Sequence, residues 1–317
     1  MTILVTGASG YVGNNTVKRL VAQGKPVRAM VQNVEKAQQR LASVKDKIEI
    51  VRGDVTKPDT LKPLMKDVTA VIHLVAIAIE KGGQTYEDLN YQGTINVVDA
   101  ANDAGVPRFI NMCQNGADSS LPYRFLKSKG RAQEYVAQKA SNWTALRPSA
   151  IFGPQDEFFN SLARLVQLTP IVFPLIGGGT AQFQPVSVDD VVEAIVRSVD
   201  DDSTTGKELA LGGPEVLTLG EIEKRIFKAL GTNRVLVPAP VGLLRIPVFI
   251  MEKMLPGSPV TTSLLELLSV PNTVPHNALI EQFKMQPKAF DSENIAYLRN
   301  NTIGNTLKKF FTNATIN

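Results

Sequence analysis

Residues 2–13 have the sequence TILVTGASGYVG, an apolar run followed at once by three glycines, Gly7, Gly10 and Gly13, spaced three residues apart. The apolar run predicts a short buried strand, and residues 11–23 carry apolar side chains at helical spacing. A tight turn from strand to helix favours glycine at its first position. Close approach to the backbone favours glycine at the second, and packing of the helix on the strand favours glycine at the third. We therefore predict a strand–turn–helix unit with accessible backbone amides in the turn.

Short β-rich runs alternate with helical patterns through the first half of the chain. The predicted strands are residues 3–5, 27–31, 48–51, 70–74, 108–112 and 144–147, and the predicted helices are residues 11–23, 34–41, 60–66, 85–104 and 123–139. Such regular alternation predicts a parallel sheet with helices on both faces, joined by right-handed crossovers. The predicted fold class is therefore α/β: a doubly wound parallel sheet (Rossmann fold) with a small mixed C-terminal lobe.

The pattern changes after Pro148, where prolines and glycines, among them the run 177–179, separate shorter elements. We predict two domains. Residues 1–153 form the Rossmann domain, and residues 154–317 form a smaller lobe interleaved with the last strands of the sheet. A substrate of such a protein lies in the cleft at the carboxyl ends of the strands.

The glycine turn stands at the first strand–helix junction of the βαβ series, which is where this fold binds the pyrophosphate of a dinucleotide. The amides of the first helical turn and the helix dipole then face the phosphates. Ser9, Tyr11 and Val12 therefore join the three glycines as predicted cofactor contacts.

Gln32, at the end of the second predicted strand, bears on the choice of dinucleotide. A carboxylate at this position would bind the ribose 2′-hydroxyl and repel a 2′-phosphate. The sequence has an amide there, with Arg28 and Lys36 nearby and no acid before Glu35. This favours NADP(H), with NAD(H) as the alternative.

Composition excludes several other classes of function. The net charge is only +4 and no dense Lys/Arg run concentrates it, so we expect no nucleic-acid partner. Cys113 is the only cysteine, and His73 and His276 are far apart in the sequence, so we expect no disulfide and no metal site. The chain shows neither a leader segment nor a run of about 18 apolar residues, which makes a cytoplasmic location the expectation.

Several motifs resemble the extended and atypical short-chain dehydrogenases/reductases. They are residues 6–13 (TGASGYVG), 53–55 (GDV), 73–76 (HLVA), 90–96 (NYQGTIN), 143–154 (WTALRPSAIFGP), 184–191 (QPVSVDDV) and 211–215 (LGGPE). Together they are similar to the NAD-dependent epimerase/dehydratase-like subgroup that contains the NADPH-holding accessory subunit of respiratory complex I. The resemblance implies that Asp54 and Val55 lie near the adenine, Leu74 and Ala76 beside the ribose, and Pro148 near the nicotinamide.

Active members of this superfamily use a Tyr-x-x-x-Lys pair on a helix, preceded by a Ser or Thr at the end of the fifth strand. Residues i and i+4 share a helix face, so the ammonium lowers the pKa of the phenol and holds the nicotinamide ribose. Tyr123 and Lys127 match this spacing literally. The family's Ser-Lys dipeptide, however, falls on residues 128–129.

That second alignment puts Lys129 at the lysine position and Phe125 at the tyrosine position, and more residues agree with it. The strand-five serine is then replaced by Cys113 or displaced to Gln114. We favour the second alignment and keep Tyr123, Lys127 and Lys129 as candidate catalytic residues. Cys113 itself is expected to be a small buried hydrophobe, and His73 a satisfied cofactor-side or core histidine rather than a metal ligand.

Two functions remain open. The protein is either an NADP(H)-dependent oxidoreductase or epimerase acting on a small-molecule substrate, or a non-catalytic nucleotide-holding subunit associated peripherally with a membrane redox complex. Residues 241–251 are apolar with a single charge, and the apolar run 264–268 follows soon after. These residues predict either helices that close a substrate pocket or a surface that docks on a membrane or a membrane-bound partner.

Overall fold

The computed structural model describes residues 2–240, 242, 268 and 270–306. It divides into two compact units, the first made of residues 1–148, 188–211 and 276–285 and the second of the remaining residues. The domain division predicted at residue 153 lies close to the Pro148–Ser149 boundary. Two later segments, however, belong to the first unit.

In the described part of the chain, the first unit contains one seven-stranded sheet in the order β3-β2-β1-β4-β5-β6-β11. The strands are β1 (Thr2–Thr6), β2 (Val27–Val31), β3 (Glu49–Arg52), β4 (Val68–His73), β5 (Phe109–Met112), β6 (Trp143–Pro148) and β11 (Lys207–Leu211). All neighbouring strands pair in parallel. The order reverses between β1 and β4, and their carboxyl ends are therefore the point where a doubly wound fold binds its ligand. The predicted fold class is confirmed.

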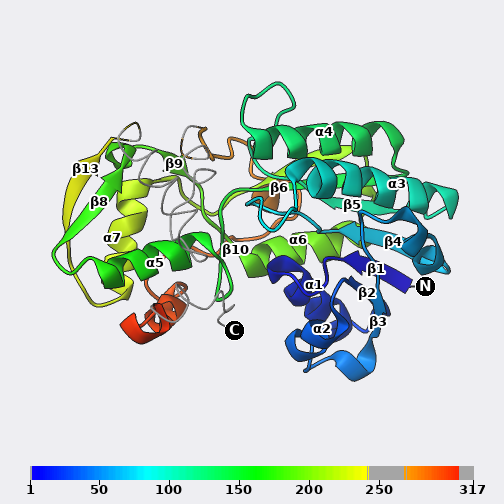
Figure 1. Ribbon diagram of the computed structural model, residues 1–317. Helices are drawn as coiled ribbons and strands as arrows, with labels where there is room; N and C mark the ends of the chain where they lie inside the picture. The colour runs from blue at the N-terminus through cyan, green and yellow to red at the C-terminus, as the bar shows by residue number, and fades with distance from the viewer. Residues whose placement is uncertain (1, 241, 243–267, 269, 307–317) are drawn as a thin grey trace. The chain divides into compact units, whose positions relative to one another are not determined.

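Helices cover both faces of this sheet (Figure 1). On one face lie α3 (Gly93–Asp103) and α4 (Arg124–Lys139), and on the other lie α1 (Tyr11–Ala22) and α6 (Val188–Asp200). The shorter α2 (Val34–Arg40) follows β2, and α10 (Ala278–Glu281) lies in the last segment of the unit.

Two helix predictions were wrong in detail. The helix predicted for residues 60–66 is a pair of 3-10 turns, Pro58–Thr60 and Lys62–Met65, each with a proline at its start. The helix predicted for residues 85–104 begins as a π-helix, Glu87–Gln92, and only then continues as α3. Insertion of a π turn changes which side chains share a face, and the buried Asn90 lies within this π turn.

Arg108 explains why residues 188–211 belong to the first unit. Its buried guanidinium donates hydrogen bonds to the carbonyl of Ser198 (2.6 Å) and the hydroxyls of Thr144 (2.7 Å) and Thr204 (2.6 Å). Burial lowers the pKa of Arg108, and the nearby Asp202 and Asp201 oppose this shift. The buried cation is thus satisfied by acceptors that residues 198–205 largely supply, and these acceptors fix α6 and β11 on the sheet.

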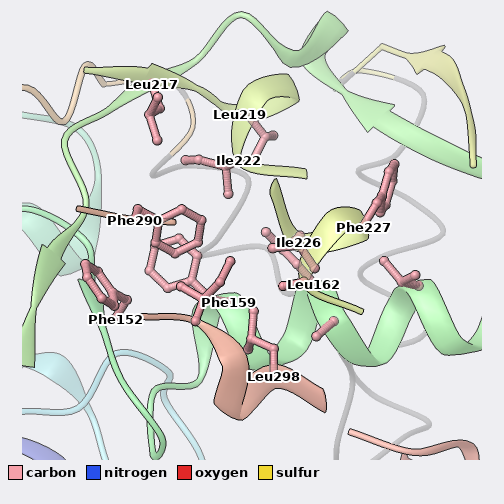
Figure 2. Packing of buried hydrophobic residues seen from close by; sticks show 14 of the residues in the cluster. Phe152, Phe159, Leu162, Leu217, Leu219, Ile222, Ile226, Phe227, Phe290 and Leu298 are labelled. Atoms are coloured by element: carbon pink, nitrogen blue, oxygen red, sulfur yellow. The ribbon is translucent and has the colours of Figure 1, made fainter. Parts of the chain in front are cut away.

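The second unit is built from short elements. They are β7 (Ile151–Phe152), α5 (Phe158–Leu168), β8 (Val172–Ile176), β9 (Gln182–Phe183), β10 (Val186–Ser187), β12 (Leu217–Thr218), α7 (Leu219–Ala229), β13 (Val235–Ala239) and the 3-10 turn Ala296–Asn300. Its apolar core lies between α5 and α7 (Figure 2). The rings of Phe152, Phe159 and Phe290 pack together there, with centroids 4.6–6.5 Å apart. Ile222 and Ile226 on α7 face the same cluster.

Glu223 lies on the buried side of α7, between apolar residues one turn away on each side, Leu219 and Phe227. Both of its carboxyl oxygens are buried and have no hydrogen-bond partner among the residues that the structure describes. Burial alone raises the pKa of Glu223 to about 8. Asp156 offers a contrast, since its buried carboxylate accepts bonds from the Tyr297 hydroxyl (2.6 Å) and the Phe159 amide (2.7 Å). Burial raises the pKa of Asp156, and these bonds hold it to about 6.

Strands β8 and β13 pair in parallel, and several apolar side chains in and beside this pair are exposed. Phe173 and Ile176 point into the core, while Ile171 and Val235 leave 71% and 62% of their surface exposed. Parallel strands are normally covered on both faces. We use the name outer β8–β13 face for the exposed strand residues Val172, Val235 and Val237 together with Leu168 at the end of α5 and Ile171 just before β8.

Residues 241–251 and 264–268 lie outside the described residues, apart from Gly242 and Leu268. The predictions made for these two stretches therefore have no structural counterpart here. Among the described helices, none has the length and apolar character needed to span a bilayer.

Candidate dinucleotide site

The three glycines of the first turn have different structural roles. Gly7 has a φ of +67°, and a Cβ there would lie 3.2 Å from the backbone of Leu74. At Gly13 a Cβ would lie 2.1 Å from the Gly7 carbonyl oxygen, so the close packing of α1 on the turn requires glycine. At Gly10 a Cβ would meet only that same oxygen, at 3.1 Å, because the position opens into a cavity.

This cavity has a volume of about 480 Å³, within the range of cofactor sites. Predicted cofactor residues that line it are Gly7, Ser9, Gly10, Gln32, Val55, Leu74 and Ala76. The other lining residues are Met30, Val31, Asn33, Lys36, Arg40, Gly53, Val75, Ile77, Gln84 and Leu89. The cavity therefore lies at the carboxyl ends of β1, β2 and β4, where the strand order reverses.

The remaining predicted residues are not among the lining residues of the cavity. Tyr11, Val12 and Gly13 form the first turn of α1. Asp54 precedes the lining residue Val55, and Pro148 ends β6, where its carbonyl accepts the Asn115 amide (3.0 Å).

Asp54 is oriented by its neighbours. Its carboxylate accepts hydrogen bonds from the amide (2.9 Å) and hydroxyl (2.8 Å) of Thr56. Burial opposes ionisation of Asp54, but the bonds from Thr56 and Gln32 and the charge of Lys57 hold its pKa below the usual value. The lining residue Gln32 is thus hydrogen-bonded to the Asp54 carboxylate, which is not itself among the lining residues.

Basic side chains border the cavity on the α2 side. Arg40, at the end of α2, donates a hydrogen bond to the Ser9 carbonyl (2.7 Å), and Lys36 lies one turn earlier. None of the described lining residues is acidic. The prediction for Arg28 was wrong, because this side chain lies at the opposite end of β2, paired with Glu49 (2.6 Å) and bonded to the Lys66 carbonyl.

Helix α4 separates the two candidate catalytic pairs. Tyr123 precedes the helix, with an extended backbone (φ −80°, ψ 112°), and Lys127 is exposed to solvent. Phe125 and Lys129 lie one turn apart on the buried face, 8% and 4% exposed. The structure therefore brings Lys129 and Phe125 together beneath the strand ends and leaves Lys127 outside.

Lys129 reaches the carboxyl end of β5. Its ammonium donates to the Met112 carbonyl (2.7 Å), and burial lowers its pKa. Cys113 follows Met112 in the chain and is buried beside Lys129. Burial raises the pKa of the Cys113 thiol, so the thiol stays protonated at neutral pH. A thiol is a weaker hydrogen-bond donor and acceptor than a hydroxyl, so Cys113 is a poor substitute for the serine or threonine expected at this position.

The geometry defines the class: a dinucleotide-binding Rossmann protein. A family model described as NAD(P)H-binding matches residues 7–202. The chain belongs to this NAD(P)H-binding family, and the predicted resemblance to short-chain dehydrogenases/reductases is confirmed.

The chain is also similar in sequence to named proteins. The chain is 33% identical over 227 residues to subunit 9 of the NADH dehydrogenase (ubiquinone) 1 alpha subcomplex from Arabidopsis thaliana. The alignment covers 70% of this chain but only 56% of that protein. The corresponding mouse subunit is 26% identical, with 93% and 79% covered.

Solved structures are similar in fold. A nucleoside-diphosphate-sugar epimerase from Staphylococcus aureus superposes with a TM-score of 0.74 at 17% identity, covering 94% of this chain and all of that one (100%). UDP-glucose 4-epimerase from Thermotoga maritima gives 0.71 at 17% identity, covering 97% of this chain and 100% of that one.

Proposed function

We propose that this protein holds NADP(H) as a bound nucleotide and does not use the tyrosine-based proton transfer of active reductases. The observation that carries the proposal is the placement of Phe125 and Lys129 on the buried face of α4. A lysine at this position can hold the nicotinamide ribose, whereas a phenylalanine ring has no proton to exchange with a carbonyl.

The preference for NADP(H) over NAD(H) rests on the basic edge of the cavity. Arg40 and Lys36 offer charged donors to a 2′-phosphate, and Gln32 does not repel it. Because Arg40 also holds the Ser9 carbonyl, it fixes the glycine turn and the phosphate-binding edge together.

The test combines cofactor titration with an activity assay. By calorimetry we expect wild type to bind NADPH more tightly than NADH. Arg40→Ala should reduce NADPH affinity about tenfold relative to NADH, as loss of one charge-assisted bond predicts. Arg28→Ala is the matched control, because that arginine is remote from the cavity and should leave the NADPH/NADH ratio unchanged. Tenfold tighter binding of NADH by wild type would contradict the preference.

The same preparations distinguish holding from catalysis. Lys129→Ala should weaken NADPH binding, because it removes the candidate ribose contact. Tyr123→Phe should change neither binding nor turnover of a panel of aldehydes, ketones and quinones. If wild type reduces a panel substrate and Tyr123→Phe loses this activity ~10²–10⁴-fold, as loss of a general acid would cause, the protein is an ordinary reductase that uses Tyr123 and Lys127.

We further propose peripheral association with a membrane-bound redox complex through the outer β8–β13 face. The relatives reported above are subunits of the NADH dehydrogenase (ubiquinone) 1 alpha subcomplex, and a group of exposed apolar side chains is typical of a protein-binding surface. In native gels of detergent-solubilised membranes, wild type should comigrate with a large assembly and Ile171→Ser/Val235→Ser should not. Val216→Ser, at another exposed apolar position, is the control. Comigration of the double variant would exclude this face.

A further inference from the structure

A row of buried polar side chains crosses the otherwise apolar sheet at one level. The strand register pairs Thr6 of β1 with His73 of β4, and His73 with Asn111 of β5. All three residues are at most 1% exposed. Above them, α3 contributes Thr94 and α4 contributes Gln133, which accepts a bond from the Asn111 amide (2.8 Å). His73 is central in this row, and the proposed function does not use it.

The hydrogen bonds around His73 assign a donor or acceptor role to each ring nitrogen. The Thr94 hydroxyl donates to the Asn90 carbonyl (2.7 Å), so it must accept from His73 Nε2–H (3.1 Å). His73 Nδ1 then carries no proton and accepts from the Thr6 hydroxyl (2.9 Å), which itself accepts from the Leu74 amide (3.2 Å). Burial, with a contribution from the charge of Lys129, lowers the pKa of His73 to about 3. The ring is therefore neutral and held in one tautomer.

Both ends of this chain reach the proposed nucleotide site. Thr6 immediately precedes Gly7, and Leu74 lines the cavity. Asn90 holds the backbone of Ile77, another lining residue, by two hydrogen bonds. The Ile77 amide donates to Asn90 Oδ1 (2.8 Å), and Asn90 Nδ2 donates to the Ile77 carbonyl (3.1 Å).

The far side of the chain reaches helix α4. The Asn90 amide donates to the Ser128 hydroxyl (3.2 Å), which donates to the Phe125 carbonyl (2.7 Å). Ser128 precedes Lys129. The His73 imidazole and the Asn90 side-chain amide thus join three segments of the first unit: residues 6–7, 74–77 and 125–129.

We propose that His73 is a positioning residue that sets the nucleotide-binding wall of the cavity and links it to helix α4, an inference that rests on the proposed nucleotide-holding function. Only a neutral imidazole with the proton on Nε2 can accept from Thr6 and donate to Thr94 at the same time. Loss of either bond leaves a buried hydroxyl without one of its partners, and the adjoining wall is then held less firmly.

Three variants separate the two sides of the ring. In His73→Asn the amide oxygen can occupy the place of Nδ1 and keep the bond from Thr6, but the side chain cannot reach Thr94. In His73→Gln the amide nitrogen can occupy the place of Nε2 and keep the bond to Thr94, but the acceptor for Thr6 is lost. His73→Leu removes both bonds. Thr144→Val is the matched control, because it removes a buried hydroxyl of the Arg108 cluster, away from the cavity lining.

We expect His73→Leu to weaken NADPH binding by about 10- to 100-fold, the range for one unsatisfied buried group, and His73→Asn to restore most of the affinity. Hydrogen exchange of the α4 amides should rank the Asn and Gln variants of His73 in the opposite order to the NADPH affinities. His73→Gln should keep the wild-type protection of the α4 amides on NADPH addition, and His73→Asn should lose it. The imidazole ¹⁵N shifts of wild type, assigned with a His276→Gln variant, should report the Nε2–H tautomer between pH 5 and 8.

His73→Leu binding NADPH as tightly as Thr144→Val would overturn the inference, and so would a protonated or mixed-tautomer ring at pH 7. Failure of the proposed function is recognised separately. In that case wild type itself fails to bind NADPH, and if it binds NADH instead, the same variants are compared with NADH.

Discussion

The Gly10→Val variant is expected to fold and melt like wild type and to bind NADPH more weakly by about 100-fold or more, roughly 2.7 kcal/mol. Gly10 has φ −71° and ψ 175°, a conformation open to any residue. Its Cβ would meet only the Gly7 carbonyl oxygen, at 3.1 Å, which requires a small adjustment of the turn. The added methyl groups would instead occupy the part of the cavity that Gly10 lines, in front of the α1 amides.

Calorimetric titration and thermal melting check both parts of this expectation. Gly220→Ala serves as the control, because its Cβ would make only ordinary contacts, at 3.4 Å or more, in the second unit. Gly13→Ala should behave differently from both and destabilise the turn, since its Cβ would lie 2.1 Å from a backbone oxygen. Wild-type affinity in a folded Gly10→Val protein would show that the nucleotide binds elsewhere.

Replacing Glu223 by methionine is expected to stabilise the second unit by about 3 kcal/mol at pH 7. The carboxyl is buried in an apolar stripe with no described partner, and burial raises its pKa from the ordinary value of 4.5 to about 8. At neutral pH the folded state must therefore keep a proton that the unfolded chain releases, and this costs free energy. Methionine has a similar length and needs neither proton nor partner.

The pH dependence gives a second measurement of the same effect. Between pH 4.5 and 8 the folded protein binds one more proton at Glu223 than the unfolded chain, so stability falls as the pH rises through this window. Above pH 8 the contribution of Glu223 no longer changes. The difference between wild type and Glu223→Met should therefore grow by about 1.4 kcal/mol per pH unit within the window.

Scanning calorimetry at several pH values is the suitable method, because the single tryptophan, Trp143, reports only on the first unit. Lys224→Met, an exposed change on the same helix, should stay within about 0.5 kcal/mol of wild type. A destabilised Glu223→Met protein would mean that the carboxyl has a stabilising partner.

The sheet was largely predictable from the sequence, and its helical connections less so. Strand predictions such as residues 3–5 succeeded because buried parallel strands are continuous apolar runs. The π turn before Gly93 was not predictable, because the apolar spacing there is that of an ordinary helix and the close packing of Gly93 on Val55 is a tertiary contact. A Cβ at Gly93 would lie 2.7 Å from the Val55 side chain.

In the candidate site, features that depend on neighbouring residues were predictable from the sequence, and contacts between distant residues were not. The glycine turn was recognisable because its spacing alone encodes its geometry. Arg40 was missed because it meets Ser9 only after α2 has folded back over the turn, 31 residues along the chain. Arg28 could have been excluded from strand direction, since it lies three residues before the carboxyl end of β2, about 10 Å away.

The interleaved chain path of the first unit has a consequence for synthesis on the ribosome. The sheet gains β11 only at residues 207–211, after residues 149–187 of the second unit have been made. At about 5–20 residues per second, a nascent chain therefore spends several seconds with β6 as an unpaired edge and Arg108 without its acceptors from residues 198–205. The nucleotide-binding unit cannot finish folding before the second unit has begun to emerge, and a chaperone that shields the β6 edge would act in this interval.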